Sequence, residues 1–304
     1  MNSLQFKKYQ LKNLCAIIGC KPYEVEYITK HMDDYYSEWV EKKKNKSTGE
    51  LKTYKDGTVK ERVIRPSQKR LKIIQSAIKT KILEPIPLPD NIHGGVKGRS
   101  NITNAKPHQG NPYQFTTDLK DFFPGITNEQ VYKALLSVGL TNHFAYWITK
   151  LTTWKYELPQ GTPTSTHIAN IVFLEVDKKL ISLCNEHGLI YTRYIDDLTF
   201  SSQKDFKPLL DVILKIVIEA GFKINYRKTE YKGLQTITGI ELFNNYIDVP
   251  KKIKVKVVEE SLTDDTNKPY TNYLERVHRT NKNMRQKISK VLSVVDIARK
   301  TTHQ

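Results

Sequence analysis

Two adjacent acids stand where a hairpin could place them on a metal ion. Asp196 and Asp197 end a Tyr-Ile-Asp-Asp tetrapeptide that lies between two β-prone runs. Asp118 ends another β-prone segment, which a Pro-Gly pair soon breaks. An Asp pair is also an ordinary turn sequence, but three carboxylates at strand ends supply the hard oxygen ligands that Mg²⁺ prefers. The pattern predicts a divalent-metal site formed by Asp118, Asp196 and Asp197.

A glutamine-glycine turn, Leu158-Pro159-Gln160-Gly161, lies between these acids and opens a long helical pattern. A strand with an acid, this turn with its helix, and a hairpin with two acids follow in that order. The order and residues resemble motifs A, B and C of reverse transcriptases, whose hairpin carries Tyr-x-Asp-Asp. The resemblance implies an RNA-directed DNA polymerase that uses two Mg²⁺ ions. It implies bridging ligands at Asp118 and Asp196, with Asp197 as a supporting carboxylate.

The same resemblance implies a set of nucleotide-binding residues in this chain. Phe123 stands where the family places an aromatic gate against a ribose 2′-hydroxyl, although Phe122 and Phe123 are both candidates for core packing. Lys228 resembles a lysine near the triphosphate, with a solvated loop lysine as the alternative. The full set is Arg62, Arg65, Phe123, Gln160, Gly161 and Lys228.

Two further segments resemble the retron group of reverse transcriptases. Asn104-Ala105-Lys106-Pro107-His108 matches the Asn-Ala-x-x-His motif of that group, and Ile237-Thr238-Gly239 is similar to its Val-Thr-Gly motif. We expect Asn104 and His108 to take part in RNA binding. A structural hydrogen-bonding role is the alternative for His108.

The retron resemblance also implies partners. Retron enzymes bind a structured noncoding RNA from their own locus, start DNA synthesis from a 2′-hydroxyl of an internal guanosine, and leave a branched RNA–DNA molecule. The complex typically serves in defence against phage. The implied partners are a cognate noncoding RNA, its reverse-transcribed single-stranded DNA, dNTPs, a defence effector protein and a host RNase H that removes the template.

The charge of the chain is concentrated in two segments. The formal net charge is +17; residues 40–81 hold 14 Lys and Arg against 4 Asp and Glu, and residues 251–304 hold 13 against 6. Two basic segments around a middle part that holds the acids suit a protein that grips a polyanion. In the C-terminal segment we expect a helical basic face to bind RNA, through Arg276, Arg279, Lys282 and Arg285.

Hydrophobic spacing and turn residues predict an α+β fold. The prediction is a right-hand polymerase with fingers, a palm whose antiparallel sheet is backed by helices, and an α-helical thumb. Its parts are a helical extension over 1–39, fingers over 40–112, a palm over 113–249 and an RNA-binding thumb over 250–304. Within the fingers, residues 52–64 are predicted to form a hairpin and residues 68–83 a helix.

The remaining features of the chain concern its compartment. Cys15, Cys20 and Cys184 lack Cys-x-x-Cys spacing, which favours free thiols in a reducing cytosol over disulfides or a zinc site. No apolar run approaches the roughly 20 residues of a membrane span, and the first residues lack a signal-peptide apolar region. We expect a cytoplasmic protein without a membrane partner.

Two other functions remain open from the sequence. One is a stand-alone bacterial reverse transcriptase of another lineage, such as one related to group II intron enzymes. The other is an RNA-binding scaffold in a defence complex. The Asn104 to His108 motif counts against the first, and the intact set of three acids counts against the second.

Overall fold

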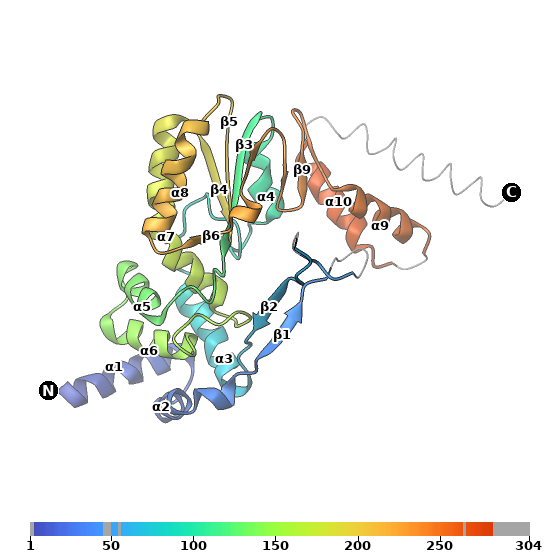
Figure 1. Cartoon of the computed structure of the whole chain (residues 1–304). Helices are drawn as coiled ribbons and strands as arrows, with labels where there is room; N and C mark the ends of the chain where they lie inside the picture. The colour runs from blue at the N-terminus through green and yellow to red at the C-terminus, as the bar shows by residue number, and fades with distance from the viewer. Residues whose placement is uncertain (1–2, 45–49, 54–55, 264–265, 282–304) are drawn as a thin grey trace.

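An antiparallel sheet forms the centre of the computed structural model, which describes residues 3–44, 50–53, 56–263 and 266–281 (Figure 1). Its middle strand is β3 (Tyr113–Lys120). On one edge β3 pairs with β5 (Asp197–Ser202), which pairs with β4 (Ile190–Tyr194). On the other edge β3 pairs with β6 (Lys223–Ile224) and β7 (Glu230–Lys232). The strand that carries Asp118 is therefore held on both sides.

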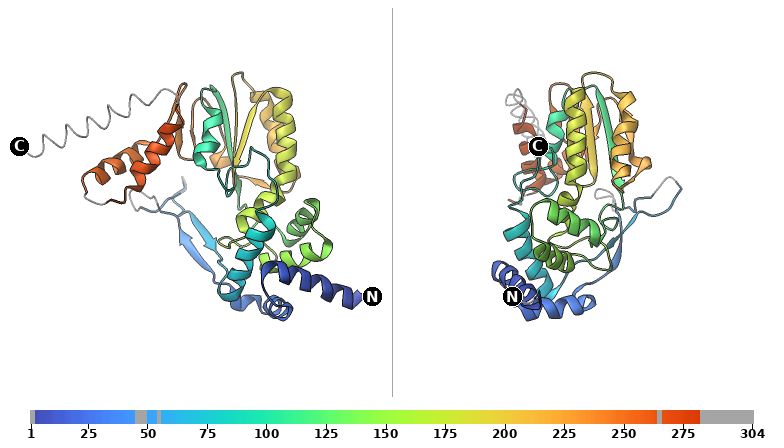
Figure 2. Two further views of the ribbon diagram at one scale, coloured as in Figure 1. Left: turned by 180° about the vertical axis from the view of Figure 1, so that it is seen from behind. Right: turned by 90° about the vertical axis from the view of Figure 1, so that its left-hand side faces the viewer.

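Two helices, α7 (Ser165–His187) and α8 (Leu210–Glu219), lie side by side over one face of this sheet (Figures 1 and 2). Between sheet and helices the rings of Phe122, Phe173 and Phe222 pack edge to face or tilted, with centroids 4.7–5.9 Å apart. α7 ends at Gly188, whose φ of 66° suits a residue without a Cβ. The short helical turn η4 (Lys207–Leu209) leads into α8, and η5 (Tyr226–Lys228) connects β6 to β7.

A helical body lies below the sheet in Figure 1. It contains α1 (Ser3–Ile18), α2 (Pro22–Lys30), α3 (Lys69–Ile78), α5 (Asn128–Ser137) and α6 (Asn142–Thr152), with short turns at η1 (Met32–Tyr35) and η2 (Lys79–Leu83). Thr127 and Gln130 form the capping box that starts α5. Gln75, fully buried, donates hydrogen bonds to the Tyr36 hydroxyl and the Leu151 carbonyl, which ties α3 to α6.

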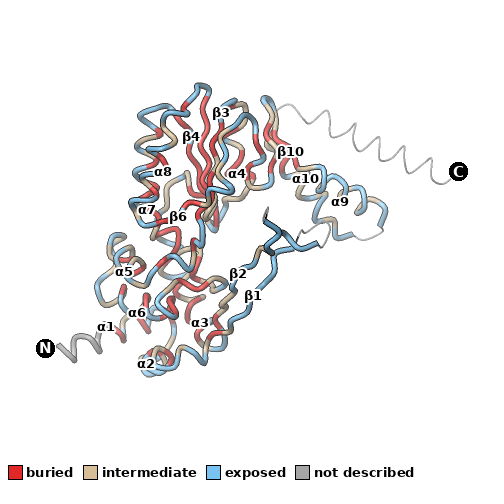
Figure 3. The backbone as a smooth tube through the Cα atoms, viewed as in Figure 1, coloured by how far each residue is buried: buried red, intermediate tan, exposed pale blue. Residues whose placement is uncertain are grey.

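The segment expected to form the fingers contains a projecting two-stranded ribbon, β1 (Trp39–Lys42) and β2 (Glu61–Ile64) (Figure 1). The predicted hairpin within residues 52–64 is only partly correct, because residues 61–64 pair with residues 39–42. The described part of residues 52–60 contributes the isolated bridge between Thr53 and Val59. Figure 3 shows the ribbon as mostly exposed, in contrast to the buried central strands.

A second, smaller core follows the central sheet along the chain. The strands β8 (Thr236–Ile237), β9 (Ile240–Leu242) and β10 (Ile247–Asp248) form a sheet against α4 (Asn101–Ala105), which continues into η3 (Lys106–His108). Next come α9 (Lys251–Ser261) and α10 (Pro269–Arg279). Asp248 anchors both helices to β10, since it accepts hydrogen bonds from Lys254 Nζ at 2.7 Å and His278 Nε2 at 2.9 Å. None of the described helices is both long and apolar enough to cross a membrane.

Candidate active site

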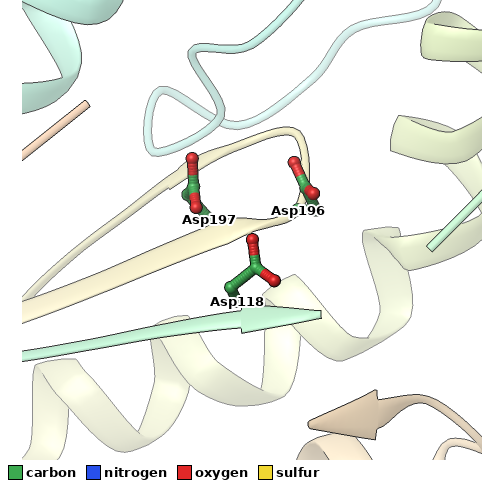
Figure 4. Close-up of side chains that lie close together, drawn as sticks. All are labelled: Asp118, Asp196 and Asp197. Atoms are coloured by element: carbon green, nitrogen blue, oxygen red, sulfur yellow. The ribbon is translucent and has the colours of Figure 1, made fainter. Parts of the chain in front are cut away.

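Three carboxylates meet at the end of β3 and the turn between β4 and β5 (Figure 4). The strand register sets Asp118 directly opposite Asp197. Leu119 N donates to the Asp196 carbonyl at 2.9 Å, which fixes the turn against the next residue of β3. One carboxylate oxygen from each of the three acids lies within 4.8 Å of the others. The acids that the sequence singled out therefore form one cluster.

Crowding and burial change the ionisation of this cluster. Asp118 is buried and its two neighbours are half-buried. Burial, and then the charge of Asp118, raises the pKa of Asp196. Burial, and then the charges of Asp196 and Asp118, raises the pKa of Asp197 to about 7. A bound cation would remove this repulsion, and the ligand set of carboxylate oxygens fits a hard divalent ion such as Mg²⁺.

Two side chains contact Asp118. Lys228 lies in η5, and Asn225 is the residue directly before η5. Asn225 Nδ2 donates to Asp118 Oδ1 at 2.9 Å, and Lys228 Nζ donates to Oδ2 at 2.6 Å. Burial lowers the pKa of Lys228, but the hydrogen bond and charge of Asp118 outweigh it, so the pKa is raised overall. Asn225 carries no sequence signal of its own, because it is a single polar residue in a segment whose recognisable feature is Lys228.

A hollow of about 130 Å³ adjoins the cluster. Asp118, Asp197 and Lys228 form its charged wall. Five threonines and two apolar residues, from β3, β5, β8 and the residue after β8, line the rest: Thr116, Thr117, Leu198, Thr199, Thr236, Ile237 and Thr238. The site therefore combines carboxylates and a lysine with an accessible space.

The two phenylalanines after Asp118 have different environments. Phe122 is 4% exposed and packs against Phe173 and Phe222, so it belongs to the core. Phe123 is half-buried, with its ring 5.7 Å from that of Phe122. Of the two residues, Phe123 is therefore the one whose side chain is exposed enough to contact a ligand.

The glutamine-glycine turn lies against the fingers ribbon. The Gln160 carbonyl accepts a hydrogen bond from Arg65 N at 2.7 Å. Gly161 has φ 107°, a conformation that requires glycine, and an added Cβ would lie 3.3 Å from Ile64 Cγ2, which shows how closely the turn packs on β2. The turn and β2 thus hold each other in place.

The two arginines of this ribbon are paired with acids. Arg62 Nη2 lies 2.6 Å from Glu41 Oε2, on the exposed ribbon. Arg65 forms ion pairs with Glu38 and Glu157. Either arginine would have to exchange these partners in order to bind a triphosphate.

Comparison with known proteins places the chain in a family. Residues 42–242 match the model of the family described as reverse transcriptase (RNA-dependent DNA polymerase). The chain belongs to the reverse transcriptase family. The α+β right-hand polymerase fold predicted from the sequence is thereby confirmed.

Retron reverse transcriptases are among the curated proteins to which this chain is similar. It is 31% identical to the retron Ec86 reverse transcriptase of Escherichia coli over 64% of each chain. It is 34% identical to the Mx162 enzyme of Myxococcus xanthus over 61% of this chain and 45% of that one. Identity to the Ec83 enzyme of Escherichia coli is 32%, over 66% of this chain and 71% of the relative. The predicted retron type is confirmed, although the chain spans only about half to two thirds of the length of Ec86 and Mx162.

Solved structures show a lower similarity. Telomerase from Candida albicans, in complex with a fragment of telomeric RNA, superposes with a TM-score of 0.47 at 11% identity, covering 88% of this chain and 58% of that one.

The two segments that resemble retron motifs contact each other in the interior. Asn104 and His108 are both fully buried. His108 Nδ1 lies 2.7 Å from Ser201 Oγ and its Nε2 lies 2.8 Å from Thr192 Oγ1, and burial lowers its pKa to about 3. Asn104 Nδ2 donates to Thr238 Oγ1 at 3.4 Å.

This burial corrects the expected RNA contact by Asn104 and His108. In the described conformation neither side chain has surface to offer RNA. The hydrogen bonds of His108 instead brace β4 and β5, the strands of the catalytic hairpin, which is the structural alternative raised for it.

The basic face expected on the thumb is described only in part. Arg276 and Arg279 lie exposed on α10, where Arg279 Nη2 is 3.0 Å from Glu275 Oε2. Lys282 and Arg285 lie outside the described residues. An RNA-binding role for these four residues stays a prediction.

Proposed function

We propose that this chain is an RNA-directed DNA polymerase that uses dNTPs to copy part of a cognate structured RNA into branched single-stranded DNA. The observation that carries the proposal is the cluster of Asp118, Asp196 and Asp197 beside an accessible hollow, in a chain of the retron reverse transcriptase family. The names of the relatives support the reverse transcription of a retron RNA.

In the proposed site the three carboxylates hold two Mg²⁺ ions. When bound, such ions activate the attacking hydroxyl and stabilise the leaving pyrophosphate. Asn225 orients the Asp118 carboxylate by donating to Oδ1, and Oδ2 would be the oxygen that ligates an ion once Lys228 releases it. Lys228 donates a hydrogen bond to Asp118 in this structure. Its positive charge suits it to bind a triphosphate oxygen close to the cluster.

The other nucleotide contacts follow the arrangement of the fingers and palm. Gln160 and Gly161 form a turn at the base of the ribbon and are suited to contact the incoming nucleotide. Phe123 presents the half-buried ring that would exclude a ribose 2′-hydroxyl. Arg62 and Arg65 would bind the triphosphate after leaving their acidic partners.

The proposed domain limits are a helical extension over 1–39, fingers over 40–112, palm over 113–249 and thumb over 250–304. The thumb binds the structured RNA. A defence effector protein and a host RNase H are the further partners proposed, in the cytoplasm.

The test is Mg²⁺-dependent primer extension on an RNA template by the double variant Asp196→Asn, Asp197→Asn. Neutralising the carboxylates removes charge that matters most in the transition state, so extension should fall by at least about a hundredfold. RNA affinity should be retained. Asp121→Asn is the matched control, since Asp121 is exposed three residues from Asp118 and has φ 51°, a conformation that Asn tolerates.

Extension by the double variant at the wild-type rate would contradict the polymerase proposal. The retron-specific part has its own test, which is to extract nucleic acid from the purified chain and digest it with RNase and a debranching enzyme. DNA covalently joined to RNA through a 2′ linkage supports it, and unbranched DNA favours a reverse transcriptase of another lineage.

A further inference from the structure

A buried charged network lies directly under the turn that carries Asp196 and Asp197. Arg193 of β4 and Asp177 of α7 are both fully buried. Arg193 Nε donates to Asp177 Oδ1 at 2.9 Å and Nη2 donates to Oδ2 at 2.6 Å, a bidentate pair. Tyr191 adds a hydrogen bond from its hydroxyl to Asp177 Oδ1 at 2.7 Å. The guanidinium also lies over the ring of Phe173, 4.8 Å from its centroid.

The same guanidinium reaches the turn itself. Arg193 Nη1 donates to the Ile195 carbonyl at 2.9 Å and to Asn170 Oδ1 at 2.9 Å. Ile195 has φ 60°, a left-handed conformation that a β-branched residue rarely adopts. Ile195, the residue next to Asp196, is therefore held in an unfavourable conformation, and Arg193 donates a hydrogen bond to its carbonyl oxygen.

Gly94 also packs against this turn and is bonded to the same network. A Cβ added to Gly94 would lie 2.4 Å from Ile195 N and 2.9 Å from the Tyr194 carbonyl carbon, so the turn packs directly on this glycine. Asn170 Nδ2 donates to the Gly94 carbonyl at 2.9 Å. Asn170 therefore links Arg193 to Gly94.

Stability alone is a poor explanation for this arrangement. A buried ion pair can often be replaced by apolar residues with little loss of stability, because desolvation offsets the attraction. Apolar residues would not supply a donor to the Ile195 carbonyl. Lysine would not supply the planar fork that binds Asp177, Asn170 and Ile195 together.

We propose that Arg193, held by Asp177 and Asn170, is a positioning residue that fixes the turn and thereby sets the distances of Asp196 and Asp197 from Asp118. The inference rests on the proposed function, since it assigns the network to a metal site. It predicts that loss of the network weakens metal binding, as loss of outer-shell partners does by about 10–100-fold in other metal sites.

The deciding variant is the triple change Arg193→Met, Asp177→Leu, Tyr191→Phe. It removes the buried charges together and leaves no partner of Asp177 unsatisfied. The expected result is a folded protein whose Mn²⁺ dissociation constant, measured by electron paramagnetic resonance, is raised about tenfold. The Mg²⁺ concentration for half-maximal nucleotide addition should rise in parallel, with the KM for dNTP nearly unchanged.

Arg193→Lys and Gly94→Ala test the same network from its two sides. Both should raise the Mn²⁺ dissociation constant. Arg193→Lys lacks the planar guanidinium, and the added Cβ of Gly94→Ala displaces the turn. Gln75→Met is the matched control, since Gln75 is also fully buried and bonded between elements but lies in the helical body. It should lower the melting temperature without changing Mn²⁺ affinity.

Unchanged Mn²⁺ affinity in the folded triple variant would overturn the inference. A triple variant that fails to fold would overturn it as well, because the network would then be a requirement of the fold. A wild-type chain that binds Mn²⁺ but adds no nucleotide would refute the proposed function and leave the positioning role in place.

Discussion

Neutralising Asp197 should stabilise the metal-free protein at alkaline pH. The pKa of this carboxyl rises from its usual 3.8 to about 7 in the folded chain, through burial and the charges of Asp196 and Asp118. Because the folded pKa is raised, the folded state is favoured while the group is protonated, and stability falls as pH rises through the folded pKa. A shift of this size corresponds to about 4 kcal/mol once the group is ionised in both states.

Asn keeps a donor that can replace the proton shared with Asp118, but carries no charge. At pH 8.5 in a chelator, Asp197→Asn should therefore melt about 8 °C above wild type, at about 2 °C per kcal/mol for a chain of this size. The difference should vanish near pH 3.5, below the unfolded pKa. Adding Mg²⁺ should raise the melting temperature of wild type more than that of the variant.

Differential scanning calorimetry over this pH range is the measurement, with Asp121→Asn as the exposed control. If wild type and Asp197→Asn melt at the same temperature at pH 8.5 in chelator, the three carboxylates do not repel one another as their geometry implies. The metal-site interpretation would then lose its electrostatic basis.

Three further outcomes are expected. Phe123→Val should raise ribonucleotide incorporation more than it lowers dNTP incorporation, measured as a ratio of kcat/KM values; equal losses would return Phe123 to a packing role. Reversing charge at Arg276 and Arg279 should lower the slope of log RNA affinity against log salt by roughly 0.7–0.9 per lost phosphate contact, and an unchanged slope would leave α10 as solvated surface. His108→Leu should cost about 1–3 kcal/mol in urea unfolding, because the buried hydroxyls of Ser201 and Thr192 each lose one hydrogen bond and keep another, whereas the RNA affinity of the folded variant should be retained.

The catalytic hairpin and the helices around it could be predicted because their signals are local. Two acids between β-prone runs specify a hairpin tip, and Gly188 ends α7 by its left-handed conformation. The capping box of Thr127 and Gln130 likewise identifies the start of α5. Each of these features depends on residues within a few positions of one another.

The elements that were missed depend on distant partners. β1 pairs with β2 across an intervening segment, and its exposed residues show no alternation of buried and exposed positions. β8 and β10 are two residues long, too short for a periodic pattern. Burial of Asn104 and His108 cannot be predicted for a similar reason, since their hydrogen-bond partners come from β4, β5 and the residue after β8.

The residues of the candidate site also differ in whether the sequence alone predicts them. Asp118, Asp196 and Asp197 could be predicted from motif order, and the structure brings them together. Asn225 and the network around Arg193 could not, because a single polar residue near a strand has many possible roles. Asn225 acquires a role only through its hydrogen bond to Asp118, and Arg193 only through the packing of α7 and the Gly94 segment against the turn.

The position of β3 in the sheet has a consequence for synthesis of the chain. All the strands that pair with β3 follow it in sequence, and β5 comes only after α5, α6 and α7. During translation, β3 therefore leaves the ribosome with both edges unpaired, and unpaired strand edges are templates for aggregation. Pairing over such sequence distances is slow. The nascent chain should be most dependent on chaperones between the emergence of β3 and that of β7, and in the first part of this window, before β5 emerges, Asp118 has not yet met Asp196 and Asp197.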